Sequence, residues 1–168
     1  MRVAIFIGTV KGYSVEKLIE CFDVVYNAKK CEDVIYSELG KFSEEVKDEM
    51  DVLINNSSDA EDLGEIIVYN VKPKFRIHSS LSTILSFDYI KDKPLIVIAD
   101  YNDGKLAISA RYQKSVPSMH ELLRYCVQDL EDASGGGHAP AAGGSIMKKD
   151  YEIFKKRLIE FMNNVNSK

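Results

Sequence analysis

The stretch Ser134-Gly135-Gly136-Gly137-His138-Ala139-Pro140-Ala141-Ala142-Gly143-Gly144 holds five of the ten glycines of this 168-residue chain. Consecutive glycines allow a backbone with positive φ whose N–H groups approach a ligand closely, because no Cβ stands in the way. Such a backbone can form an anion-binding nest, and His138 can donate a hydrogen bond to the anion. A flexible linker is the alternative, but the residues after His138 are small and apolar where linkers are polar. The pattern favours a structured anion-binding or nucleotide-binding loop, with Gly136 at positive φ.

The composition limits the classes of protein that this chain can belong to. A length of 168 residues with 45% hydrophobic side chains suits one domain, or one domain with a small extra lobe. The net charge of −4 argues against coating nucleic acid through bulk positive charge. Cys21, Cys31 and Cys126 lack the spacing of a zinc site or a disulfide framework, so we expect buried free thiols in a reducing cytoplasm. No signal peptide or membrane span is predicted.

The first 60 residues are predicted to form a small N-terminal α/β lobe. Short runs rich in β-branched residues predict strands at residues 3–7, 23–26, 33–36 and 52–54. Helices are expected at residues 15–22, with Ser14 as the N-cap, and at residues 43–50. The strand directly after Met1 indicates an intact start. A polar run at residues 55–62 marks the domain boundary near residue 60.

The second part, residues 64–163, is predicted to be a mixed β-sheet flanked by helices, so the fold class is α/β. Strands are expected at residues 65–71, 95–100 and 105–110, and the last two are joined by a hairpin turn at Asp103-Gly104. Helices are expected at residues 79–87, 119–130 and 151–162. Lys72, Lys74 and Arg76 alternate, which suits either a charged strand edge or a stripe that contacts phosphates.

The order of these elements resembles the DHH-associated domain, the C-terminal substrate-binding domain of the DHH phosphoesterases, which include the RecJ exonucleases and the nanoRNases. Family members carry a serine and an arginine at the end of a hairpin strand, as Ser109 and Arg111 do here, followed by a helix and a GGGHxxAAG loop. The interval of 24 residues from Arg111 to Gly135 also matches. Two departures are Pro140, which stands one position late, and Tyr112, where the family more often has serine.

The resemblance implies a site that grips a phosphate or the sugar–phosphate backbone of a nucleic acid. Arg111 can contact a phosphate with two donors, and Ser109 can add a hydroxyl donor. The ligand would be single-stranded nucleic acid or a phosphorylated nucleotide, and DNA, RNA and a mononucleotide all stay open. The residues implied are Ser109, Arg111, Gly135, Gly136, Gly137, His138, Ala141, Ala142 and Gly143.

The DHH enzymes hold manganese or magnesium on aspartates and histidines of a separate domain, and this chain contains no Asp-His-His. A hard divalent cation needs several converging carboxylates or histidines, so we expect no catalytic residue, metal or cofactor in this chain. The interpretation that we favour is a non-catalytic binding module. One alternative is a phosphoesterase or exonuclease component, either with manganese or magnesium on a partner chain that carries the catalytic domain or as a fragment of a longer enzyme that contains that domain. The other is a structural subunit-docking protein.

Overall fold

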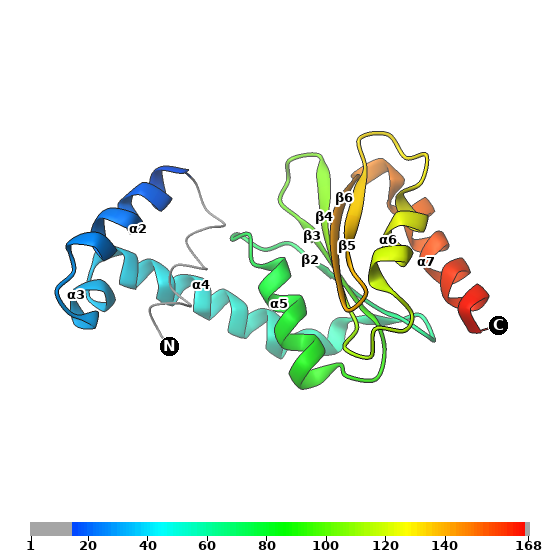
Figure 1. The fold of residues 1–168 in the computed structure, drawn as a ribbon, viewed down its shortest axis with the longest axis horizontal. Coiled ribbons are helices and arrows are strands. Elements are labelled where there is room, and N and C mark those ends of the chain that lie inside the picture. Colours follow the sequence, from blue (N-terminus) through cyan, green and yellow to red (C-terminus); the bar gives the residue numbers. More distant parts are fainter. Residues whose placement is uncertain (1–14, 167–168) are drawn as a thin grey trace. The chain divides into compact units, whose positions relative to one another are not determined.

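The computed structural model describes residues 15–166, so the strand expected at residues 3–7 and the Ser14 cap lie outside the described residues. The chain divides into two compact units, each of which is described by itself. One contains residues 15–53 and 74–77, and the other contains residues 54–73 and the chain from residue 78 onward. Figure 1 shows their elements in sequence colours.

Over the described residues, the elements of the first unit are helices, joined by short turns and followed by the irregular segment at residues 74–77. The unit contains α2 (Val15–Asn27), α3 (Cys31–Ile35) and most of α4 (Glu38–Asn55). The strands predicted at residues 23–26, 33–36 and 52–54 are therefore wrong. Cys21 and Val34 are buried and pack against Val24, Val25 and Phe42, because one face of each helix carries the apolar side chains. This burial outweighs the modest preference of valine for strands.

The second unit is built on a six-stranded mixed sheet with the order β1-β2-β3-β4-β6-β5. Strands β2 and β3 are parallel, and the other neighbours are antiparallel. This arrangement confirms the predicted α/β class. The elements along the chain are η1 (Ser57–Asp59), β1 (Glu61–Asp62), β2 (Ile67–Val71), α5 (His78–Ile84), the π-turn η2 (Leu85–Tyr89), β3 (Leu95–Asp100), β4 (Lys105–Arg111), α6 (Met119–Val127), β5 (Ser134–His138), β6 (Ala141–Met147), η3 (Lys148–Asp150) and α7 (Tyr151–Asn166).

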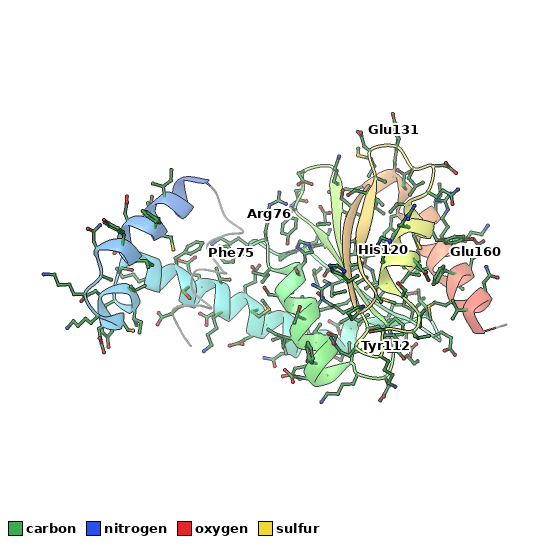
Figure 2. The ribbon with its side chains drawn as sticks, viewed as in Figure 1. Phe75, Arg76, Tyr112, His120, Glu131 and Glu160 are labelled. Carbon is green, nitrogen blue, oxygen red and sulfur yellow. The ribbon has the colours of Figure 1, made fainter. Side chains whose placement is uncertain are left out.

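The two faces of the sheet are covered differently. The face that we call the core face packs against α6 and α7, and its apolar cluster includes Ile96, Ile108, Leu122, Phe154 and Leu158. The opposite face carries α5, which contacts mainly β3 and β4. We call this face the open face. Figure 1 shows α5 on one side of the sheet and both α6 and α7 on the other. Tyr112, labelled in Figure 2, closes the core beyond β4.

Several predicted elements of this unit are confirmed. Strand β3 has the predicted bounds, and Asn102 and Gly104 take positive φ in the turn that leads to β4. Helix α6 begins at Met119, where Ser118 Oγ accepts a hydrogen bond from the backbone N–H of Glu121. None of the helices within residues 15–166 combines the length and the hydrophobicity that a bilayer-spanning segment needs.

The glycine-rich stretch is a β-hairpin and not a loop. Strand β5 pairs with β6 from Ser134 to His138, and β6 pairs with β4 along its whole length. Isolated glycines weaken strands because they add flexibility and no side chain. Here both strands gain ladder hydrogen bonds, and α6 covers one face of β5, so tertiary contacts decide the structure. The prediction of a loop is therefore wrong, and its glycines lie on a sheet.

Candidate functional site

Three rows of cross-strand neighbours run over the open face of β4, β6 and β5. Residues directly opposite each other in a ladder point to the same face of a sheet. The rows are named by their defining residues. The arginine row is Arg111, Ala141 and His138, the glycine row is Ser109, Gly143 and Gly136, and the serine row is Ala107, Ser145 and Ser134.

The glycine row forms a shallow floor between the two other rows. A Cβ added at Gly136 would have no atom within 4 Å, and one at Gly143 would meet only Ile108 O at 3.5 Å. Gly136 also has no positive φ, so that expectation is wrong; the residue with positive φ is Gly137, at 145°. Gly136 and Gly143 therefore leave open space above the strands where other residues would place side chains.

The other three glycines of the hairpin allow backbones to approach one another. A Cβ at Gly137 would lie 2.5 Å from Ala141 O, and a Cβ at Gly144 would overlap Ser134 O. At Gly135 the added atom would lie 3.1 Å from Leu123 O of α6. These glycines keep β5 against β6 and α6 against β5, which is a structural role.

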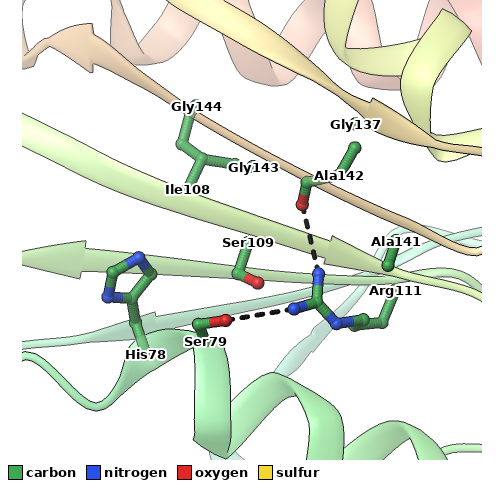
Figure 3. A pocket seen from close by; sticks show the side chains of 10 residues that line it. All are labelled: His78, Ser79, Ile108, Ser109, Arg111, Gly137, Ala141, Ala142, Gly143 and Gly144. Carbon is green, nitrogen blue, oxygen red and sulfur yellow. Dashed lines mark hydrogen bonds between the residues drawn. The ribbon is translucent and has the colours of Figure 1, made fainter.

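A pocket of about 300 Å³ lies between α5 and the open face (Figure 3). Its lining includes six of the residues that the sequence predicted: Ser109, Arg111, Gly137, Ala141, Ala142 and Gly143. Gly135, Gly136 and His138 do not line it. His138 is exposed at the far end of the arginine row, and Gly135 faces α6.

Arg111 is held by four hydrogen bonds. Its Nη1 donates to Ala110 O at 2.9 Å and to Ala142 O at 3.2 Å, and its Nη2 donates to Ser79 Oγ at 3.1 Å. The Nε group donates to Thr83 Oγ1 at 3.4 Å. A guanidinium has five N–H donors, so one donor, on Nη2, is unused. A two-donor contact from Arg111 alone would require one of these bonds to break.

The charge of Arg111 has no carboxylate partner among the described residues, since all four acceptors are neutral oxygens. Burial lowers the pKa of the guanidinium because it removes water from the charged group. Arginine nevertheless stays protonated in proteins. The positive charge of Arg111 at the pocket is therefore compensated only by the dipoles of neutral oxygen acceptors. Such a charge favours the binding of an anion beside it.

Three serines connect α5 to β4. Ser109 is 2% exposed, and its Oγ lies 2.8 Å from the Oγ of Ser82, which is fully buried. Ser82 Oγ in turn donates to Ser79 O at 2.9 Å. Ser79 itself is exposed, and its Oγ accepts from Arg111. These bonds fix the hydroxyls around the pocket relative to one another.

Two lining residues, His78 and Ser79, begin α5 and were not predicted from the sequence. The only signal for them in the sequence is that polar residues open a predicted helix beside a strand. In the structure, the Nδ1 atom of His78 lies 2.9 Å from the hydroxyl of Tyr101. The first turn of α5 thus places an imidazole and a hydroxyl at one wall of the pocket (Figure 3).

The basic stretch after β2 is divided between the two units. Lys72 belongs to the sheet-containing unit, whereas Lys74 and Arg76 belong to the helical one. The Nζ atom of Lys74 pairs with Glu45 at 3.3 Å, and its backbone N–H donates to Glu49 at 2.6 Å. Lys74 is therefore already paired with a carboxylate. Residues 72–76 follow the end of β2 at Val71 and form no strand, so the structure supports neither a charged strand edge nor an extended stripe that contacts phosphates.

Within residues 15–166, no group of three or more histidine, cysteine, aspartate or glutamate side chains is placed to hold a metal ion. The described residues therefore do not fit the manganese or magnesium site of a phosphoesterase. The pocket itself offers the guanidinium of Arg111, the imidazole of His78, serine hydroxyls and backbone groups. The arrangement is suited to holding an anion.

Comparisons with known proteins agree with this architecture. Residues 64–164 match the model of the DHHA1 domain, and no curated protein matches the chain. Similar solved structures include RecJ from Thermus thermophilus in complex with Mg²⁺ (15% identity, TM-score 0.71), CDC45 from Entamoeba histolytica (15%, 0.60) and the pGpG-specific phosphodiesterase PggH from Vibrio cholerae (14%, 0.55).

These structures are longer than the present chain. The likeness covers 98%, 96% and 94% of this chain, but only 25% of the RecJ chain, 37% of the CDC45 chain and 54% of the PggH chain. At such low identities the likeness shows a shared fold alone. Activities, substrates and partners of those proteins are not thereby assigned to this one.

Proposed function

Because this chain belongs to the DHHA1 domain family, as a DHH-family accessory domain, we propose that it is a non-catalytic module that binds phosphate groups of single-stranded nucleic acid or of a nucleotide. The binding site is the pocket between α5 and the open face, which Ser109 and Gly143 of the glycine row line and beside which Gly136 continues the row.

The observation that carries this proposal is the state of Arg111. Its guanidinium is positioned by four bonds to neutral oxygens, and no carboxylate of the described residues neutralises it. The unused Nη2 donor and the hydroxyl of Ser79 lie side by side, since these groups are 3.1 Å apart. Because Ser79 Oγ accepts from Arg111, its own hydrogen remains to be donated. Together they offer two donors to one phosphate, and hydrogen bonds to charged groups contribute about 1.5–3 kcal/mol.

The glycine row supports the same proposal by its shape. Side chains on β6 and β5 at these positions would fill the space over the strands, whereas Gly143 and Gly136 leave it open. A sugar or a base can therefore lie against the sheet while its phosphate reaches Arg111, two residues along β4 from Ser109. This geometry suits an extended single strand better than a duplex.

The test is a calorimetric titration with a uridine hexanucleotide and its 2′-deoxy form. Arg111→Lys should weaken binding of either probe about 10- to 150-fold, the equivalent of one lost hydrogen bond to a charged group. Ser79→Ala should weaken it less, because Arg111 keeps its other partners. The matched control is Arg124→Lys, at an exposed position of α6, the helix that packs on the core face; this variant should bind like the parent. Parental affinity in both pocket variants would contradict the proposal.

A second candidate is a subunit of a phosphoesterase whose catalytic domain lies on another chain. The shares of the similar structures that this chain covers support this candidate, because the match spans a quarter of the RecJ chain and about half of the PggH chain. Incubation of the chain alone with the hexanucleotides and Mn²⁺ should give no cleavage product. Turnover that survives further purification and disappears with a chelator would favour the enzyme, and binding of neither probe would favour a docking protein.

A further inference from the structure

The hydrogens of the three serines around the pocket can be assigned by counting donors. A serine hydroxyl has one hydrogen and two lone pairs. Ser82 Oγ is 2.9 Å from Ser79 O, an acceptor that has no hydrogen to offer, so Ser82 must be the donor of that bond. The 2.8 Å bond between Ser82 and Ser109 then requires the hydrogen of Ser109. Any other assignment leaves one of these contacts without a hydrogen.

Ser109 therefore presents a hydrogen-bond acceptor to the pocket, whereas Ser79 presents a hydrogen-bond donor. The hydrogen of Ser109 is used internally, and both lone pairs of its Oγ remain without a donor among the described residues. Ser79 accepts from Arg111 and keeps its hydrogen for a ligand. The hydroxyl donor that the sequence predicted at Ser109 is thus an acceptor, and the donor is at Ser79.

A ligand that complements this pocket has an anionic oxygen beside a hydroxyl. The anion meets Arg111 and Ser79, and the hydroxyl donates to Ser109. Ser109 and Arg111 are two residues apart on one strand, about 7 Å between Cα atoms, and both reach into the pocket of about 300 Å³. A ribonucleotide linkage carries this pair of groups on adjacent sugar carbons, as a 2′-hydroxyl beside a 3′-phosphodiester. A deoxyribonucleotide lacks the hydroxyl.

On the basis of the proposed function, we infer that Ser109, oriented by Ser82, makes the pocket select ribonucleotide over deoxyribonucleotide strands by accepting a hydrogen bond from a sugar hydroxyl. Ser82 is fully buried in α5 and lies behind Ser109. It is a positioning residue, because it acts only through the direction of the Ser109 hydroxyl.

The experiment compares three uracil hexanucleotides without terminal phosphates, so that no phosphate hydroxyl can act as the donor. Their sugars carry a 2′-hydroxyl, a 2′-hydrogen or a 2′-O-methyl group, the last of which keeps an oxygen but has no hydrogen to donate. The parent protein should bind the 2′-hydroxyl strand about three- to tenfold more tightly than either other strand, as expected for one hydrogen bond between neutral groups.

Two variants and one control assign this selectivity to residues. Ser109→Ala should lower the ratio of ribo to deoxy affinity to about one and leave the affinity for the deoxy strand nearly unchanged. Ser82→Ala frees the Ser109 hydrogen to point at the phosphate, so the ratio should fall while the deoxy strand binds more tightly. Ser134→Ala, at an exposed hydroxyl of the serine row outside the pocket, should keep the parental ratio.

The outcomes separate this inference from the proposed function. Equal binding of the ribo and deoxy strands by the parent would overturn the inference and leave the proposed function standing. A parental ratio in folded Ser109→Ala would also overturn it. If Ser109→Ala does not fold, the ratio in Ser82→Ala decides in its place. Binding of none of the three strands would overturn the proposed function, and the inference with it.

Discussion

The open face and the core face of the sheet use the same glycine-rich hairpin in different ways. On the open face, Gly136 and Gly143 border empty space, so a side chain there would meet a ligand before it met the protein. Elsewhere in the hairpin, Gly137 and Gly144 lie against the backbone of the neighbouring strand. Glycines that are adjacent in sequence thus contribute separately to binding and to stability, and variants can distinguish the two contributions.

The largest expected effect is on the reactivity of Cys126, a thiol in the core on the α6 side of the sheet. Cys126 lies in the core behind the sheet, and burial raises its thiol pKa to about 12. Only the thiolate reacts, so at pH 8 Cys126 should react with iodoacetamide about a thousandfold more slowly than in the unfolded chain, where the pKa is near 9. Cys31 is exposed, so the expectation of a buried thiol is wrong at this position, and Cys31 should react readily. Mass spectrometry of the labelled peptides measures both rates.

The same shift predicts a pH dependence of stability. In the folded state the Cys126 thiol stays protonated, whereas in the unfolded state it ionises above its ordinary pKa of 9. The free energy of unfolding should therefore fall as the pH rises from about 9 toward 12, and Cys126→Ala should reduce this slope. Rapid labelling of Cys126 at pH 8 would contradict its burial in a packed core.

The next effect is on stability and concerns Gly144. An alanine there would overlap the Ser134 carbonyl of β5, so the hairpin strands must separate. We expect Gly144→Ala to lower the free energy of unfolding by about 2–3 kcal/mol, a fall in Tm of about 4–12 °C for a chain of this size. Gly136→Ala is the matched control, because its added methyl enters open space. Equal Tm values for the two variants would remove the distinction between the two kinds of glycine.

Gly136→Val tests whether the glycines of the open face leave room for the ligand. Its Cβ would stand beside the pocket with no atom of the described residues beyond its chain neighbours within 4 Å, where the side chain would meet a nucleic-acid strand lying on β5 and β6. Overpacking of a contact costs about 1–3 kcal/mol, so binding of the uridine hexanucleotide should weaken roughly 5- to 150-fold with little change in Tm. Unchanged affinity in this variant would mean that the ligand does not cross the glycine row.

The smallest effect is expected at His138. The resemblance to the DHH-associated domain implied a direct role in gripping phosphate, but His138 is exposed at the end of the arginine row and does not line the pocket. His138→Ala should weaken binding by no more than about threefold, as for one weak, solvent-exposed hydrogen bond. Calorimetry with the hexanucleotide measures it. A loss as large as that of Arg111→Lys would place the phosphate at His138 instead.

The sequence predicted the sheet well where local patterns decide the structure. The apolar run of β3 and the Asp103-Gly104 turn are sufficient to predict β3 and β4. Prediction failed where contacts across the chain decide it. Val24 and Val25 look like strand residues but pack inside a helical unit, and the glycines look like a loop but pair with β4 through β6. Ser79 could not be found, because only the fold brings the start of α5 against Arg111.

The most direct test of the open-face site is a titration of the uridine hexanucleotide into protein with ¹³C-labelled alanine methyl groups, followed by NMR. Ala107 and Ala141 point to the open face and are half-buried, whereas Ala110 and Ala142, which are opposite each other in the β4–β6 ladder, are buried on the core face. We predict that the methyl signals of Ala107 and Ala141 shift with a common binding curve while those of Ala110 and Ala142 stay in place. Shifts confined to Ala110 and Ala142, or no shift in any of the four, would contradict binding on the open face.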